Sequence, residues 1–124
     1  MEKEPIYKDL SYQIVGLCMQ VHRELGYGFL EKVYENALMV AFEENQIPAK
    51  QQCPIKVVFH DQVVGDYFAD IVVEDSVIIE LKALDRISKA HRAQTLHYLK
   101  ATEYRLALLV NFGRSSLEYE RLVH

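Results

Sequence analysis

Two β-rich runs separated by three polar residues constrain the fold of this chain more than any other feature. Residues 63–73 and 77–81 are dominated by valine, isoleucine and aromatic side chains, which favour strands, and the polar residues 74–76 between them are typical of a turn. If these three residues form the loop of an antiparallel hairpin, Asp70 stands opposite Glu80. A two-residue loop would instead send these two side chains to opposite faces of the sheet.

The hairpin predicts a candidate metal site. Side chains alternate along a strand with period two, so Lys82 shares a face with Glu80. Two neighbouring carboxylates repel each other unless a cation neutralises them, and carboxylate oxygens are the ligands that Mg²⁺ or Mn²⁺ prefers. Next to them, Lys82 can position or deprotonate an attacking water while charge builds up on a phosphoryl oxygen. The alternative is a structural ion pair between Lys82 and one of the acids on a half-exposed sheet face.

The remaining apolar patterns predict a mixed α/β fold. Spacings of three and four between apolar residues are typical of amphipathic helices, and short runs rich in β-branched residues are typical of strands. A helix between the hairpin and the last apolar run allows that run to pair in parallel with a hairpin strand. We predict helices at 7–25, 30–45 and 88–102, a three-stranded antiparallel meander from 55–60, 63–73 and 77–81, a buried strand at 106–112, and an edge strand or loose tail at 117–123.

Composition narrows the function classes. The 124 residues are enough to close one core, so we expect a single domain, and the two cysteines, Cys18 and Cys53, are too few for a disulfide framework. No apolar run approaches the roughly 20 residues that span a bilayer, so we expect a cytoplasmic protein without a membrane segment. The net charge is −4, yet residues 82–105 carry six basic and two acidic side chains, a local excess that suits an anionic partner.

Three stretches of the chain carry a family resemblance: GYGFLEKVYENAL (26–38), GDYFADIVVEDSVIIELKAL (65–84) and HRAQTLHYLKAT (91–102). They closely resemble the GxxExxR protein family of the PD-(D/E)xK nuclease superfamily. The resemblance covers nearly the whole chain in the family's order, with Tyr34 in place of the arginine in the family's name. It matches Glu31 to the superfamily's helical acid, Asp70 to its aspartate, and Glu80 and Lys82 to its E-x-K pair.

The resemblance implies both a fold and an activity. It implies a PD-(D/E)xK restriction-endonuclease-like core over residues 1–124, a mixed β-sheet flanked by helices in the order α-α-β-β-β-α-β(-β). It implies a metal-dependent nuclease that hydrolyses nucleic acid, with DNA the expected substrate, by means of a water activated by Mg²⁺ or Mn²⁺. The expected metal ligands are Asp70 and Glu80 with help from Glu31, although Glu35, one helical turn later, is an alternative to Glu31.

Further residues are expected to support the site. Gln94 and Tyr98 lie four apart on one helix face, and their spacing is similar to a fourth motif found in part of the superfamily. In the functional interpretation Gln94 orients the lysine, a water or a phosphate oxygen, and Tyr98 hydrogen-bonds a carboxylate; alternatively Tyr98 belongs to the core and Gln94 to the surface. The expected nucleic-acid contacts are Lys82, Arg86, Lys89, His91 and Arg92.

Two other functions stay open on the sequence alone. The chain can be a catalytically inactive module that keeps the nuclease fold and binds nucleic acid or a protein partner. It can also form a homodimer through an apolar face, which would help a small nuclease engage duplex DNA and so does not exclude the first hypothesis.

Overall fold

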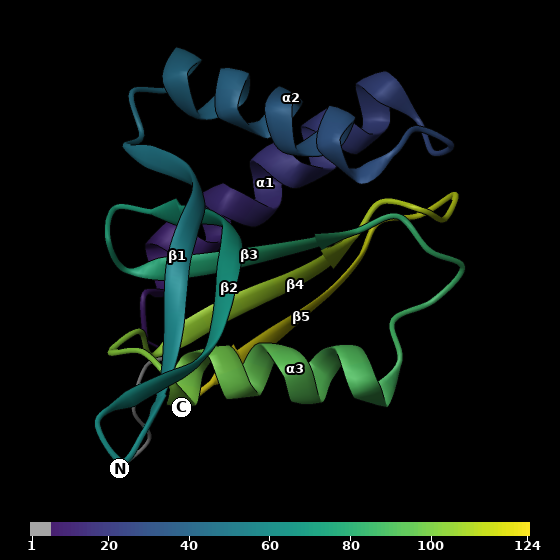
Figure 1. The fold of residues 1–124 in the computed structure, drawn as a ribbon. Coiled ribbons are helices and arrows are strands. Elements are labelled where there is room, and N and C mark those ends of the chain that lie inside the picture. Colours follow the sequence, from purple (N-terminus) through teal and green to yellow (C-terminus); the bar gives the residue numbers. More distant parts are fainter. Residues whose placement is uncertain (1–5) are drawn as a thin grey trace, which may run out of the picture.

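The computed structural model describes residues 6–124 and consists of one mixed sheet with helices on both faces (Figure 1). Strands lie side by side in chain order, β1-β2-β3-β4-β5. The elements, in sequence, are α1 (Lys8–Leu25), α2 (Glu31–Glu44), β1 (Ala49–Phe59), β2 (Gln62–Val73), β3 (Val77–Lys82), α3 (Lys89–Lys100), β4 (Leu106–Asn111) and β5 (Glu118–Val123). This is the predicted order of elements, and it confirms the expected fold class.

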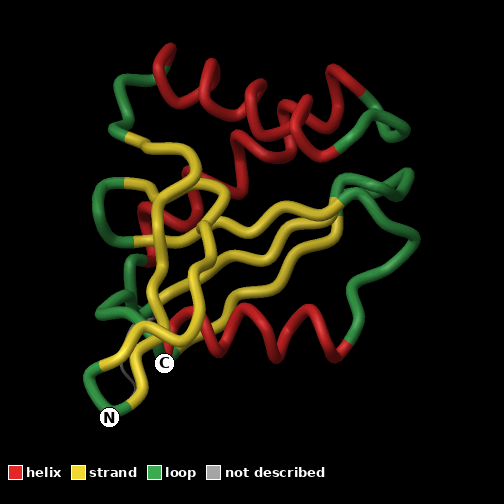
Figure 2. The backbone as a smooth tube through the Cα atoms, in the orientation of Figure 1, coloured by secondary structure: helices red, strands yellow, loops and turns green. Residues whose placement is uncertain are grey.

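Three layers follow from the way the apolar faces are divided. Alternate residues of β3 face opposite sides of the sheet: Ile79 packs in the core beneath α1 and α2, whereas Ile78 packs beneath α3. Figure 2 shows the resulting arrangement, with α1 and α2 together on one side of the strands and α3 alone on the other. The apolar spacing predicts that Val33, Tyr34 and Leu38 of α2 face inward together with Leu30, the residue just before the helix. Tyr34 and Leu38 are buried, whereas Leu30 and Val33 are exposed.

The strand pairings agree with the predicted meander. β1 and β2 are antiparallel, β2 and β3 are antiparallel, and β4 runs parallel to β3 after the α3 crossover. β5 is an antiparallel edge strand, which settles the alternative left open for the tail. β1 begins at Ala49, earlier than residue 55; Pro54 lies inside it, and an edge strand tolerates proline because only one side of the strand needs its N–H groups for the sheet.

A glycine marks where the chain leaves β4. A Cβ atom at Gly113 would overlap the backbone nitrogen and oxygen of Leu84, in the loop that follows β3. We therefore expect Gly113→Ala to lower the free energy of unfolding by about 3 kcal/mol, because the two backbone segments must separate. Urea unfolding followed by circular dichroism measures the change.

The matched control for this prediction is Gly16→Ala. Gly16 lies in α1 with no atom within 4 Å of the added methyl group. The free energy of unfolding of Gly16→Ala is expected to rise by about 0.5–1 kcal/mol, because alanine is the better helix former. A Gly113→Ala protein as stable as the wild type would contradict the close approach of the two loops.

Candidate active site

The β2–β3 hairpin has the register that the sequence predicted. Residues 74–76 form the loop, with Glu74 and Asp75 in the left-handed region (φ 51° and 52°), and Val73 pairs with Val77. Pairing continues to Ile71 opposite Ile79. The loop length is therefore the odd one on which the candidate site depends.

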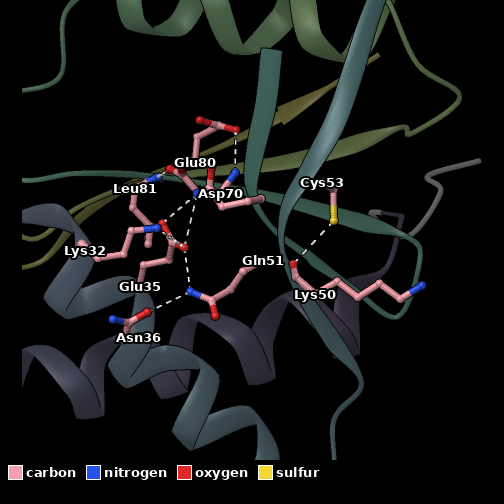
Figure 3. Close-up of polar contacts among 10 residues, drawn as sticks. Lys32, Glu35, Asn36, Lys50, Gln51, Cys53, Asp70, Glu80 and Leu81 are labelled. Carbon is pink, nitrogen blue, oxygen red and sulfur yellow. Dashed lines mark hydrogen bonds and ion pairs between the residues drawn. The ribbon is translucent and has the colours of Figure 1, made fainter. Parts of the chain in front are cut away.

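Beyond Ile71 the two acidic side chains link the strands. The Leu81 N–H donates to Asp70 Oδ2 at 2.8 Å, and the Asp70 N–H donates to Glu80 Oε1 at 3.3 Å (Figure 3). Each carboxylate thus accepts a hydrogen bond from a backbone N–H of the opposite strand, where a backbone carbonyl would accept it in a regular ladder. These bonds fix both side chains where β2 and β3 separate, and they engage one oxygen of each.

Burial makes this pair of carboxylates electrostatically unfavourable. Glu80 is only 6% exposed, and burial, followed by the charge of Asp70, raises its pKa to about 8. Burial also raises the pKa of Asp70, against the effect of its hydrogen bond from Leu81. The protein therefore holds two carboxylates close together in an environment that disfavours their charge, an arrangement typical of functional sites.

Lys82 is the nearby cation. Its charge opposes the rise in pKa of Glu31, Asp70 and Glu80. Within residues 6–124, however, no carboxylate oxygen lies within 4 Å of its ammonium nitrogen. Lys82 acts on the acids at longer range and keeps its donors free for another group.

The two candidate acids of α2 have different surroundings. Glu35 is 3% exposed and accepts hydrogen bonds from Lys32 at 3.0 Å, Gln51 at 2.7 Å and Gln52 at 3.1 Å. Glu31, in the first turn of α2, accepts no hydrogen bond from any side chain in the described part of the chain. Burial raises the pKa of Glu31, and the charges of Lys82 and Asp70 reach it, so its carboxylate lies near the pair and is not committed elsewhere.

Gln52 is a residue at the site that the sequence analysis missed. It lies in β1 between the paired residues Gln51 and Cys53, yet its φ of 52° is left-handed and interrupts the ladder opposite Asp70. Its amide donates to Glu35 at 3.1 Å, and its polar side chain lowers the pKa of Asp70 against the effect of burial. Gln52 thus connects α2 to the acidic pair, and nothing in its local sequence distinguishes it from other strand glutamines.

The α3 candidates are divided between core and surface. Tyr98 is buried, and its pKa is raised by burial and then by the charge of Glu80, which places it on the side of the helix toward the acids. Gln94, one turn earlier, is exposed and lines a groove together with Tyr98. His91 forms a capping box with Ser88, in which its Nδ1 accepts the Ser88 N–H at 3.0 Å.

The predicted basic contacts are only partly free. Arg86 and Lys89 are exposed in the loop and first turn that lead into α3. Arg92 instead binds both carboxylate oxygens of Glu120 in β5, at 2.7 and 2.6 Å, so part of its charge is already balanced.

A buried amide holds the loop after Lys82. Asn111, fully buried at the end of β4, accepts the Leu84 N–H at 2.9 Å and donates to the Leu84 carbonyl at 2.9 Å. It also donates to Glu118, which accepts the Ile87 N–H at 3.1 Å. The loop is therefore tied to β4 and β5, which fixes the direction of the chain just beyond Lys82.

The donor set fits Mg²⁺. Within residues 6–124 no three histidine, cysteine or acidic side chains form a ready-made metal cage. Mg²⁺ does not require one, because it is commonly bound by one or two carboxylates together with waters and substrate phosphates. Asp70 Oδ1 and Glu80 Oε2 take no part in the hydrogen bonds described above, so each carboxylate keeps an oxygen for a cation.

The fold and the acidic pair define a class of protein, a mixed-sheet domain of nuclease type. A family model described as the PD-(D/E)XK nuclease superfamily matches residues 8–122, nearly the whole chain. The chain therefore belongs to the PD-(D/E)XK nuclease superfamily. No curated protein matches it. None of the helices in the described part of the chain is long and apolar enough to cross a membrane.

Proposed function

We propose that residues 1–124 form one domain that hydrolyses phosphodiester bonds of nucleic acid, with DNA the expected substrate, in a Mg²⁺- or Mn²⁺-dependent reaction. The single observation that carries the proposal is the hydrogen-bonded pair of half-buried Asp70 and buried Glu80 beside an uncommitted lysine. We further propose that the chain belongs to the GxxExxR group within the superfamily and acts in the cytoplasm.

In this proposal Asp70 and Glu80 would hold the divalent cation, and Glu31 would complete the set from α2. A bound Mg²⁺ or Mn²⁺ would supply positive charge for the phosphoryl oxygens and would make the attacking water easier to ionise. As an ammonium, Lys82 positions that water and offsets the negative charge that develops in the transition state; as a free amine, it would instead take the proton of the water. The Leu81 N–H keeps Asp70 in the required orientation.

The remaining candidates have binding roles. Gln94 contacts a phosphate oxygen or a water, and Tyr98 supports the acidic pair from α3. Arg86 and Lys89, with Lys82, His91 and Arg92, line the path of the nucleic acid. Their positive charge is concentrated after β3, where it attracts a phosphate chain toward the acids.

The test is a cleavage assay with the purified protein. Single-stranded and duplex DNA, and RNA of the same sequence, are incubated with Mg²⁺ or Mn²⁺ and analysed on denaturing gels. We expect strand scission that requires the divalent cation and stops in EDTA. Intact substrates of all three kinds, with a protein that circular dichroism shows to be folded, would contradict the proposal.

A second candidate is a module that keeps the fold and binds without cleaving. The observation that favours it is the excess of basic side chains over residues 82–105, which suits an anionic partner whether or not that partner is cleaved. Calorimetry separates the two functions, because a metal held by the native state produces binding heat and raises the melting temperature. If neither Mg²⁺ nor Mn²⁺ produces binding heat or raises the melting temperature, the non-catalytic module is the favoured function. Sedimentation in the same buffer tests the predicted homodimer.

A further inference from the structure

A groove lies between the β1–β2 hairpin and the C-terminal half of α3. β1 and β2 bend across the sheet, so that their outer part lies beside this half of the helix (Figure 1). The groove has a volume of about 580 Å³. Its lining comes from Lys56, Val57 and Val58 in β1, Tyr67 in β2, and Gln94, His97, Tyr98, Lys100 and Ala101 in and just after α3.

The lining combines positive charge with an aromatic surface. Lys56 and Lys100 contribute two ammonium groups, His97 adds an imidazole, and none of the lining residues among 6–124 is acidic. Tyr67 is 44% exposed, with its ring centroid 5.5 Å from that of Tyr98 and tilted by 47°. A polyanion with flat apolar groups, which is a nucleic acid strand, complements this surface.

The Tyr67 ring is held in place rather than free to swing. One neighbour is Tyr98, and another is Gly65, where an added Cβ would come within 3.2 Å of the Tyr67 ring. Glycine at this position leaves space for the ring to lie along the strand. A fixed ring loses little conformational entropy when a flat ligand stacks on it.

The groove lies on the same face of the sheet as the Glu80 side chain. Glu80 and Ile78 share one side of β3, and Ile78 packs in the same cluster as Tyr98, which lines the groove. Gln94, a turn earlier on the same helix, also lines the groove. A strand cleaved at the acidic pair can therefore continue past Tyr98 toward Tyr67.

We infer that this groove binds unpaired nucleotides next to the scissile phosphate, with one base stacked on Tyr67 and the backbone phosphates near Lys56 and Lys100. In a duplex both faces of every base are covered by its neighbours, so a base reaches Tyr67 only from a single strand or an unpaired end. The inference rests on the proposed function for the position of the scissile phosphate, and it narrows the substrate to single-stranded nucleic acid.

The first test measures binding without cleavage. A fluorescein-labelled single-stranded 12-mer is titrated with protein in EDTA, and its anisotropy is recorded. We expect Tyr67→Ala to weaken binding about tenfold, since stacking of one base on an aromatic ring has this magnitude, and Tyr67→Phe to keep near wild-type affinity. Phe68→Ala is the matched control, because Phe68 is an exposed aromatic residue adjacent in β2 that does not line the groove.

The second test concerns the lysines. If Lys56 and Lys100 each neutralise one phosphate, replacing one of them with glutamine makes the negative slope of log affinity against log salt shallower by about 0.7. A duplex of the same sequence is expected to bind more weakly than the single strand and to be insensitive to Tyr67→Ala. Melting temperatures of all variants show whether each remains folded.

The outcomes separate this inference from the proposed function. Equal affinity of Tyr67→Ala and wild type for the single strand, or an equal loss for Phe68→Ala, would overturn the groove assignment and leave metal-dependent cleavage intact. Tyr67-dependent binding of the single strand by a protein that cleaves nothing supports the groove and contradicts the hydrolase. A groove that binds no nucleic acid of either kind would overturn the inference in favour of another occupant.

Discussion

Lys82→Ala is expected to lower the rate of phosphodiester cleavage by about 10²- to 10⁴-fold, the range measured when a general acid or base is removed. Asp70→Ala is expected to abolish cleavage, because it removes both a proposed metal ligand and the acceptor that holds the Leu81 N–H. Initial rates at saturating Mg²⁺ give the two numbers. Retained affinity for single-stranded DNA in EDTA would locate the defect in the chemical step.

The controls come from an ion pair on the same hairpin and its neighbour strand. Lys50 and Asp75 lie 3.8 Å apart, with side chains 75% and 80% exposed, and neither has a role in the proposed site. Lys50→Ala and Asp75→Asn each remove one charge of the type lost in Lys82→Ala or Asp70→Ala. They are expected to keep wild-type rates. Substantial cleavage by both Lys82→Ala and Asp70→Ala would refute the assignment of the site.

Glu80→Gln is expected to make the metal-free protein more stable at pH 8 and above. The folded-state pKa of Glu80, about 8, lies above the ordinary value of 4.5, so the folded state binds the proton more tightly than the unfolded state. The resulting stability is complete below about pH 4.5 and is lost as pH rises to about 8. The loss is on the order of a few kcal/mol in EDTA, and glutamine removes it.

The same variant tests the metal. If Mg²⁺ binds the folded state only, as proposed, it is expected to stabilise the wild-type protein by about 2.7 kcal/mol at 100 times its dissociation constant. Glu80→Gln is expected to lose most of this gain, while Asp75→Asn keeps both the gain and the pH profile. Thermal melts in EDTA and in Mg²⁺ between pH 5 and pH 9 measure both effects. Identical profiles for Glu80→Gln and wild type would mean that Glu80 is neither strained by burial nor a ligand.

Local patterns were sufficient for the elements and for the central hairpin. A strand has a side-chain period of two, so an odd loop at 74–76 was enough to predict which residues of β2 and β3 stand opposite each other. The start of β1 was predicted too late because Pro54 is a strand breaker in most settings. β1 accommodates Pro54 only because it lies at the edge of the sheet, and that position is a property of the tertiary fold.

The partners of the site residues depended on contacts between distant segments. Glu31 and Glu35 occupy one face of α2 and are equivalent by sequence spacing, but β1 brings glutamines to Glu35 and leaves Glu31 free. By sequence, Arg92 is equivalent to the other basic residues of this region. In the structure, β5 places Glu120 against it, so that Arg92 forms an ion pair.

The sequence by itself determined the order of elements, the hairpin register and the set of acidic and basic residues near the end of β3. These follow from short-range periodicity and from the stereochemistry of a three-residue loop. Only the tertiary structure decided that Gln52 reaches the acidic pair, that Asn111 ties the loop after Lys82, and that Tyr67 meets Tyr98 across a groove. Those contacts join residues far apart in the chain, and their geometry depends on how the strands bend and how the helices pack on them.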